Sequence, residues 1–370
     1  MRQAQIILPV GVTVRTPAGD RYVIDGLLGR GRSGTIYLVH GRRARHNLFA
    51  LKEVIHPDKQ DRERFIFEGE VLKRLDHRAL PRVYQVFERD QLKRVYLLMD
   101  YIQGQNLEAL YKEHPDQRFA LPLVLALMTP IVDALIYLHR QDPPIVHRDI
   151  KPANIIVPTG GGEAVLVDFG SAKEYVAGDA TTILTHRSPG YAALEQYGGG
   201  TSPRTDIYGL GATLYTLLTG TVPTDAITRI TGSKSKGGDP LKSVHLLAPT
   251  VPATVAQAIE RAMAISSEDR FETVEAFWQE VNAYATRQAV QLPRVTSVDP
   301  PQPLPEQDTG RRIPAPRASK RGALFFFFFA LLVTIALETG FLSHAWDLTI
   351  LLLLFMGGLL LSLLLLRDRW

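Results

Sequence analysis

Short apolar runs bounded by turn residues occupy the first hundred positions of the chain. Most of these runs are rich in β-branched and aromatic side chains, and Gly, Pro, Asn or Asp residues separate them. Runs of this length and composition predict β-strands. The strands predicted in this way are residues 10–15, 21–27, 35–39, 49–52, 83–87 and 95–99.

One of these strands carries a lysine, Lys52, in an otherwise apolar run. A buried charge needs a partner. Residues 61–75 offer one, because Phe65, Glu68, Leu72 and Leu75 recur at helical spacing, which places Glu68 within the apolar stripe and Glu70 off it. We therefore expect an ion pair between Lys52 and Glu68. The alternative is that both are ordinary surface charges.

The part of the chain from residue 121 to residue 285 is predicted to be mainly helical. Residues 121–139 form an apolar, periodic run that is interrupted at Pro130. They predict a long helix with a kink, because proline removes a backbone hydrogen bond inside a helix. Another helix is expected around residues 274–284.

After residue 285 the pattern changes abruptly. Residues 286–322 form a basic segment, and the seven prolines between positions 291 and 321 predict an extended linker. Residues 323–337 and 348–366 are almost purely apolar. The second run is long enough to span a bilayer, whereas the first reaches that length only if the segment through Leu342 lies at the interface.

Basic residues flank these apolar runs. They are Arg311, Arg312, Arg317, Lys320, Arg321, Arg367 and Arg369, and no Lys or Arg lies between Gly322 and Leu366. The positive-inside rule therefore places both ends in the cytoplasm, with residues 338–347 outside and residues 367–370 as a cytoplasmic tail. We expect residues 323–366 to form two transmembrane helices in contact with the lipid bilayer. The alternative is a buried hairpin in a soluble protein.

Composition narrows the classes of function. The chain has no cysteine, which excludes disulfides, zinc–thiolate sites and thiol chemistry. The net charge of +4 is modest, and the basic residues form no stripe with interleaved aromatic residues, so binding to nucleic acid is not expected. A signal peptide is not expected either, because the apolar run at residues 6–8 is short and ends at Pro9.

Gly29, Gly31 and Gly34 form a G-x-G-x-x-G pattern. By itself the pattern fits a dinucleotide-binding turn or an ordinary hairpin equally well. Because predicted strands flank it on both sides, we place the glycines in a β-hairpin, whereas a dinucleotide-binding unit would require a helix. In a hairpin, the glycines would let backbone N–H groups approach phosphates closely.

Residues 147–154 read His-Arg-Asp-Ile-Lys-Pro-Ala-Asn, and residues 166–170 read Leu-Val-Asp-Phe-Gly. Together they supply a base, a cation and two metal ligands, the set that phosphoryl transfer from ATP requires. With the glycine-rich hairpin, they resemble the protein kinase family, specifically bacterial serine/threonine kinases of the eukaryotic type. The resemblance covers residues 21–285, preceded by an extension at residues 1–20. It implies an α+β, two-lobed fold with a β-rich N-lobe and a mainly α C-lobe.

The resemblance also implies roles for the residues of the two motifs. Asp149 would accept or orient the hydroxyl proton of a protein substrate, and Lys151 would neutralise charge on the transferring phosphoryl group. Asn154 and Asp168 would bind Mg²⁺, or Mn²⁺ in its place. A lysine at position 151 is typical of serine/threonine kinases.

The resemblance further implies the nucleotide site. Lys52 would orient the α- and β-phosphates of ATP, and Glu68 would hold Lys52 in place. Met99 would be the gatekeeper beside the adenine, which backbone groups of Asp100 and Ile102 would bind. The other residues implied at this site are Leu28, Gly29, Gly31, Gly34, Ile36 and Ala50.

The segment from residue 168 to residue 195 resembles a kinase activation segment. It has Leu194 where the family has proline, and Glu195 is expected to pair with Arg270. Ser188 would bridge Asp149 and Lys151, and Asp206 would cap a central helix and hold the backbone of the catalytic loop. Autophosphorylation, between two kinase copies, is expected at residues that would pair with Arg148, namely Thr181, Thr182 and Thr185.

These observations predict an ATP- and Mg²⁺-dependent serine/threonine protein kinase that signals from the inner face of a bacterial plasma membrane. One alternative is a membrane-anchored pseudokinase that binds nucleotide and recruits partners. The presence of every expected catalytic group favours the enzyme. A small-molecule kinase of the aminoglycoside type would lack both the spacing of Lys151 and the segment from Ser188 to Glu195.

Overall fold

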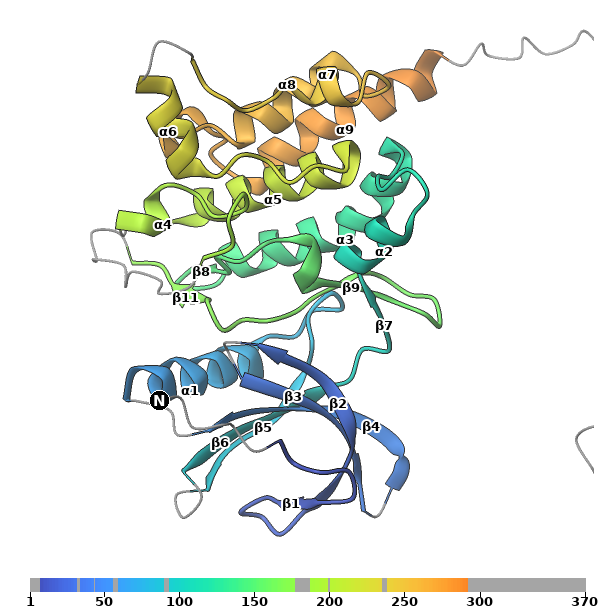
Figure 1. The fold of residues 1–370 in the computed structure, drawn as a ribbon, viewed down its shortest axis with the longest axis vertical. Coiled ribbons are helices and arrows are strands. Elements are labelled where there is room, and N and C mark those ends of the chain that lie inside the picture. Colours follow the sequence, from blue (N-terminus) through green and yellow to red (C-terminus); the bar gives the residue numbers. More distant parts are fainter. Residues whose placement is uncertain are drawn as a thin grey trace, which may run out of the picture. The chain divides into compact units, whose positions relative to one another are not determined.

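The computed structural model describes residues 7–31, 34–42, 44–55, 59–89, 93–176, 187–198, 200–234 and 238–291. All of them belong to one unit that comprises residues 1–294. Within this unit, strands with one helix make up the part before residue 101, and helices dominate the part after it (Figure 1). These two parts are the predicted N-lobe and C-lobe.

The N-lobe is a six-stranded antiparallel sheet in the order β1-β2-β3-β4-β6-β5, with helix α1 packed on β5. The strands predicted from the sequence are confirmed, and β1 shows that part of the expected N-terminal extension belongs to this sheet. The elements are β1 (Thr13–Arg15), β2 (Arg21–Gly31), β3 (Gly34–Gly41), β4 (Ala44–Ile55), α1 (Lys59–Arg74), β5 (Val83–Arg89) and β6 (Arg94–Asp100).

Both faces of this sheet are covered, which explains why its strands are so apolar. Successive side chains of a strand point to opposite faces. Along β6, Tyr96 and Leu98 join a small core with Val14, whereas Val95 and Leu97 join the large core that includes α1 and extends into the C-lobe.

The C-lobe is built around α5, whose side chains are almost all buried, and α3, α7, α8 and α9 pack against it. Figure 1 shows α5 at the centre of these helices. The helices are α2 (Leu107–Glu113), α3 (Leu121–His139), α4 (Glu195–Gly198), α5 (Pro203–Thr219), α6 (Ala226–Lys234), α7 (Val244–Leu247), α8 (Ala253–Ala262) and α9 (Val274–Gln291).

Short strands and the 3₁₀ turn η2 carry the loops that face the N-lobe, whereas the 3₁₀ turn η3 connects α8 and α9. Two small antiparallel sheets join them, in the orders β10-β9-β7 and β11-β8. The elements are β7 (Gly104–Asn106), β8 (Ile145–Val146), η2 (Pro152–Asn154), β9 (Ile155–Pro158), β10 (Val165–Leu166), β11 (Lys173–Glu174) and η3 (Ser267–Asp269).

Helix α3 covers the predicted residues, Leu121–His139, with Pro130 inside it, and the kink there stays a prediction. Two details differ from the sequence-based expectation. Helix α9 extends to Gln291, past the expected boundary at residue 285. The prediction that Asp206 caps the central helix is wrong. Ser202 is the N-cap of α5 and forms a capping box with Thr205, because its hydroxyl can accept a hydrogen bond from the first turn.

Among the described residues, one helix, α3, has the length and apolar composition to cross a membrane. Eight of its side chains are buried, and it packs against α5 and α9, as a core helix does. The two expected transmembrane helices at residues 323–366 lie outside the described residues, as do Thr181, Thr182 and Thr185.

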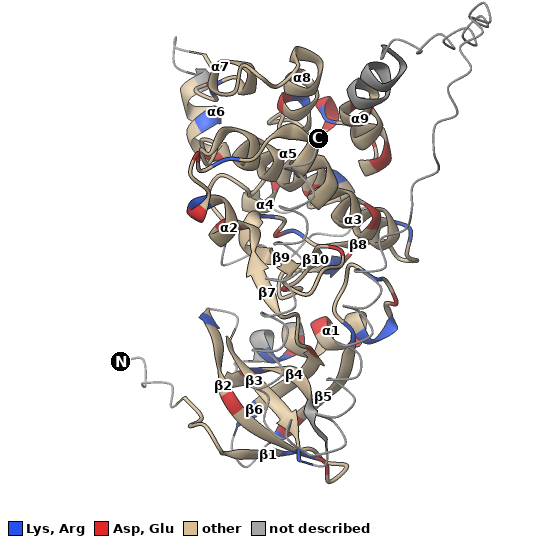
Figure 2. Ribbon diagram, turned by 90° about the vertical axis from the view of Figure 1, so that its right-hand side faces the viewer, with Lys and Arg blue, Asp and Glu red and all other residues tan. Residues whose placement is uncertain are grey.

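Charged residues of both signs occur in both lobes (Figure 2). Several form exposed ion pairs, such as Lys112 with Glu108 and Arg140 with Glu275. Exposed pairs of this kind contribute little to stability individually, so burial of the apolar faces holds the fold together.

Candidate active site

Lys52 and Glu68 form the ion pair that the helical periodicity predicts. Lys52 lies on β4, is 2% exposed, and its Nζ donates to Oε1 and Oε2 of Glu68 at 2.8 and 2.9 Å. Burial by itself lowers the pKa of Lys52, but the charges of Glu68 and Asp168 outweigh it and raise the pKa above its usual value. Lys52 is therefore a permanent cation at this position.

A glycine that the sequence analysis did not single out brings Glu68 to this position. A Cβ atom at Gly69 would lie 2.1 Å from Cγ2 of Val86, so α1 can rest directly on β5 only because this residue is glycine. The signal in the sequence is a glycine within a helical pattern, which often marks close packing.

Asp168 joins the same cluster from the C-lobe. Its Oδ1 accepts a hydrogen bond from Lys52 Nζ at 3.1 Å, and the charge of Lys52 lowers the pKa of Asp168 although burial opposes this. Its φ angle of 65° is left-handed, a conformation that non-glycine residues retain only when their surroundings hold it. The next residue, Phe169, is buried with its ring 4.6 Å from that of His147.

Three side chains converge on Asp149. Lys151 Nζ donates to Asp149 Oδ2 at 2.7 Å and to Ser188 Oγ at 2.8 Å. Ser188 Oγ donates to Asp149 Oδ1 at 2.7 Å, which forms the expected bridge between Asp149 and Lys151. The amide of Asn154 donates to the backbone oxygen and to Oδ2 of Asp149, both at 2.9 Å.

Asp206 holds the backbone of this loop, as predicted. Its carboxylate accepts the N–H groups of His147 at 2.8 Å and Arg148 at 2.7 Å, and it also bonds His139. Burial by itself raises the pKa of Asp206, but these hydrogen bonds and the charge of His139 hold it below its usual value. Burial also lowers the pKa of His147, so its imidazole is neutral and serves packing.

The activation segment ends in the predicted buried ion pair. Arg270 is bidentate on Glu195, with Nη1 at 2.6 Å and Nη2 at 2.9 Å from the two carboxylate oxygens. Leu194, which replaces the family's proline, is half-buried and packs against the core. A residue that sequence reasoning missed, Gln196, bonds the backbone N–H of Ala193 across this turn at 2.9 Å.

Several expected nucleotide-binding residues lie close together in the sheet. Ile36 pairs with Lys52, and Ala50 pairs with Met99 on β6. The carboxylate of Asp100 accepts from Arg82 N at 3.0 Å and from Tyr84 Oη at 2.7 Å, so its side chain is occupied. The backbone N–H of Asp100 also donates to the backbone oxygen of Arg82 at 3.0 Å, so the contact with adenine that the resemblance implies would come from the carbonyl oxygen of this residue. Ile102 follows in the segment between β6 and β7.

The glycine-rich hairpin is confirmed as β2 and β3, with Gly31 opposite Gly34, while its tip lies outside the described residues. Gly34 has φ 129°, and a Cβ there would lie 2.4 Å from the backbone oxygen of Glu53. Position 34 therefore requires glycine, because the neighbouring strand β4 leaves no room for a side chain. Leu28, at an irregular point of β2, is exposed, and nothing lies within 4 Å of a Cβ at Gly29.

The oxygen atoms that Asn154 and Asp168 offer suit a hard cation. No group of three or more His, Cys, Asp or Glu residues could hold a metal within the described part of the chain. Asn154 uses its amide nitrogen on Asp149, which leaves its oxygen free, and Asp168 supplies a carboxylate. One carboxylate and one amide oxygen fit Mg²⁺, which usually takes few protein ligands and completes its shell with water and phosphate.

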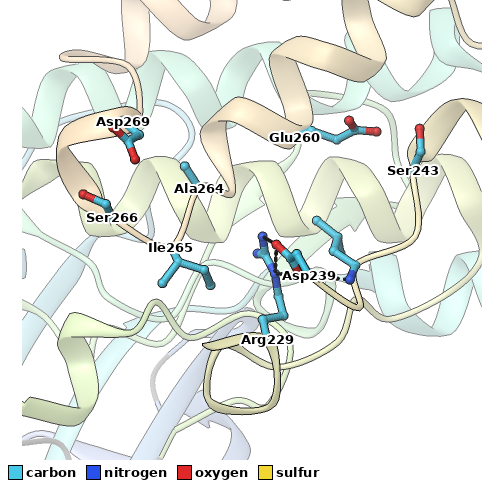
Figure 3. A pocket seen from close by; sticks show the side chains of 9 residues that line it. Arg229, Asp239, Ser243, Glu260, Ala264, Ile265, Ser266 and Asp269 are labelled. Atoms are coloured by element: carbon cyan, nitrogen blue, oxygen red, sulfur yellow. Dashed lines mark hydrogen bonds and ion pairs between the residues drawn. The ribbon is translucent and has the colours of Figure 1, made fainter. Parts of the chain in front are cut away.

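A separate depression of about 610 Å³ lies in the C-lobe. Its lining residues are Arg229, Asp239, Leu241, Ser243, Glu260, Ala264, Ile265, Ser266 and Asp269 (Figure 3). In its wall, buried Arg229 donates to Asp239 and to the backbone oxygen of Met263 at 2.7 Å each. The ion pair of Arg229 and Asp239 connects the segment before α7 to the end of α8. None of the residues expected to act in catalysis lines the depression.

Comparison with known proteins agrees with this geometry. The family model described as "Protein kinase domain" matches residues 22–276. Serine/threonine-protein kinase C of Synechocystis sp. is 32% identical over 275 residues, which cover 70% of this chain and 49% of the relative. Serine/threonine-protein kinase PrkC of Bacillus subtilis is 31% identical over 268 residues, 69% of this chain and 39% of the relative. The chain thus spans about half the length of these curated relatives or less.

Among solved structures, the kinase domain of Mycobacterium tuberculosis PknI is similar to this chain. It is 27% identical, with a TM-score of 0.59, and the match covers 76% of this chain and 100% of that one. Residues 22–276, which the family model matches, include every residue of the two clusters around Lys52 and Asp149.

Proposed function

This chain belongs to the protein kinase family, and on that basis we propose that it is a serine/threonine protein kinase that uses ATP and Mg²⁺. The observation that carries the proposal is the convergence of Lys151, Ser188 and Asn154 on Asp149. A scaffold that only binds nucleotide would not require this arrangement. The relatives named serine/threonine-protein kinases support the same choice.

The geometry supports a role for each side chain in transfer to a protein hydroxyl. Asp149 orients the hydroxyl and takes its proton, while Lys151 keeps the carboxylate in place and places a positive charge beside the phosphoryl group. Lys52, fixed by Glu68, holds the phosphates of ATP. Bound Mg²⁺, held by Asn154 and Asp168, would neutralise charge on the phosphates.

The proposal is tested by incubating the full chain with labelled ATP. We expect Mg²⁺-dependent phosphate on serine or threonine, and mass spectrometry should place part of it on Thr181, Thr182 or Thr185. A rate per molecule that rises with protein concentration would support transfer between two copies. Binding of ATP with no transfer to any protein would instead support the pseudokinase, and transfer to an aminoglycoside alone would support a small-molecule kinase.

We also propose that residues 323–366 anchor the kinase at the inner face of a bacterial plasma membrane, where it takes part in signalling. The support is the uncharged length of the two apolar runs and the basic residues on both sides.

The anchor predicts that the full chain stays in the membrane fraction at alkaline pH, whereas a chain ending at Pro293 is soluble and keeps its kinase activity. A reporter fused after Trp370 should read as cytoplasmic. Because the chain has no cysteine, a single Ser343→Cys variant can be labelled from outside if the loop is exposed there. An extracytoplasmic reporter would contradict the hairpin.

A further inference from the structure

Gln196 links the activation segment to the catalytic loop through two hydrogen bonds. It lies on α4, directly after Glu195, and is 3% exposed. Its Nε2 donates to the backbone oxygen of Arg148 at 2.8 Å, and its Oε1 accepts the backbone N–H of Ala193 at 2.9 Å. One buried amide therefore joins the end of the activation segment to the catalytic loop. Groups from both segments meet at Asp149.

These two contacts fix the orientation of the amide. A flipped amide would set its NH₂ group against the N–H of Ala193 and its oxygen against the carbonyl of Arg148. Both ends would then lose their hydrogen bonds inside the protein, where an unpaired polar group is costly. Gln196 can therefore occupy only one of its two orientations.

The carbonyl that Gln196 binds sits at a strained point of the backbone. Arg148 has a φ angle of 66°, in the left-handed region that a non-glycine residue seldom adopts. Such a conformation persists when surrounding contacts hold it. On one side Asp206 binds the N–H of Arg148, and on the other Gln196 binds its carbonyl oxygen.

The peptide that follows Arg148 carries Asp149, so its orientation determines where the carboxylate of Asp149 lies. Asn154 bonds the next carbonyl, that of Asp149 itself. Of these three supports, only Gln196 comes from the activation segment and its final turn.

We propose that Gln196 is a positioning residue that transmits the order of the activation segment to Asp149 by holding the left-handed peptide at Arg148. This inference rests on the proposed kinase activity and adds a residue to it. It predicts that loss of the amide donor lowers kcat, and leaves KM for ATP within about twofold, because Lys52 and Asp168 are untouched.

The competing explanation is that Gln196 only stabilises its own turn through Ala193. Gln196→Glu separates the two roles, since the carboxylate still accepts from Ala193 but, when ionised, has no proton to donate to Arg148. A buried carboxyl group beside a carbonyl oxygen has a raised pKa. Protonation would therefore restore the donor, which gives the variant a pH signature.

The experiment compares kcat of the full-length wild type, Gln196→Glu and Gln196→Met between about pH 9 and about pH 6. At about pH 9 we expect the kcat of both variants to be lower than that of the wild type by about tenfold or more. As pH falls, the ratio of Gln196→Glu to wild type should rise at least about threefold, whereas the ratio for Gln196→Met should stay constant.

A ratio for Gln196→Glu that does not change with pH, or kcat of that variant within about twofold of wild type at every pH, would overturn the inference. The pH comparison needs only Gln196→Glu and the wild type, so it holds even if Gln196→Met does not fold. An inactive wild type would remove the proposed kinase function itself, which distinguishes the two failures.

Discussion

Replacing Asp149 with asparagine is expected to lower kcat for phosphate transfer by about 10²–10⁴-fold, the usual contribution of a general base. Asparagine has nearly the same size, so the contacts with Lys151 and Ser188 lose charge while the packing stays. Transfer to a protein substrate under saturating ATP, together with nucleotide affinity, measures the effect. Affinity for ATP should change little, because in the proposed mechanism Asp149 acts on the acceptor hydroxyl and not on the nucleotide.

The matched control is Asp116→Asn, which makes the same chemical change at an exposed position after α2. Its kcat should equal that of wild type. If Asp149→Asn retained more than about a tenth of the wild-type kcat, Asp149 would not be the base.

Arg270→Leu is expected to lower the free energy of unfolding by about 3–5 kcal/mol, the usual result of removing one member of a buried ion pair. The Arg270 side chain is fully buried, bidentate on Glu195, and also donates to the backbone oxygens of Ala264, Ile265 and Arg204. Its loss would leave a carboxylate and these carbonyls without their partner. Urea unfolding of the chain ending at Pro293, followed by tryptophan fluorescence, measures the change.

Arg204→Leu is the control for this prediction. Arg204 pairs with Glu268, whose side chain is 80% exposed, so its loss should cost about 1 kcal/mol or less. If Arg204→Leu and Arg270→Leu lowered the free energy of unfolding equally, the ion pair of Arg270 and Glu195 would not stabilise the fold as a buried pair. Glu195→Gln is a milder variant that keeps the shape of the pair, and it should fall between the two.

The sequence by itself determined the features that are encoded over short distances. Asp149, Lys151 and Asn154 lie on one loop because they lie within eight consecutive residues, 147–154. The short apolar runs separated by turn residues determine the strands of the N-lobe. Helical spacing also selected Glu68 over Glu70 as the partner of Lys52, because it shows which side of a helix turns inward.

Pairs that join distant segments became predictable only through the resemblance to a known family. Glu195 and Arg270 lie 75 residues apart, and no periodicity in the sequence connects them. The same is true of Ser188 and Asp149, which are 39 residues apart.

Only the tertiary structure decided the roles of Gly69 and Gln196. Gly69 is required because β5 lies against α1. The cap of α5 is a local feature by contrast, because Ser202 directly precedes the helix whereas Asp206 is its fourth residue. Gln196 acts on a carbonyl 48 residues away. A sequence shows which groups can donate or accept a hydrogen bond, but their partners are set by which segments the folded core brings into contact.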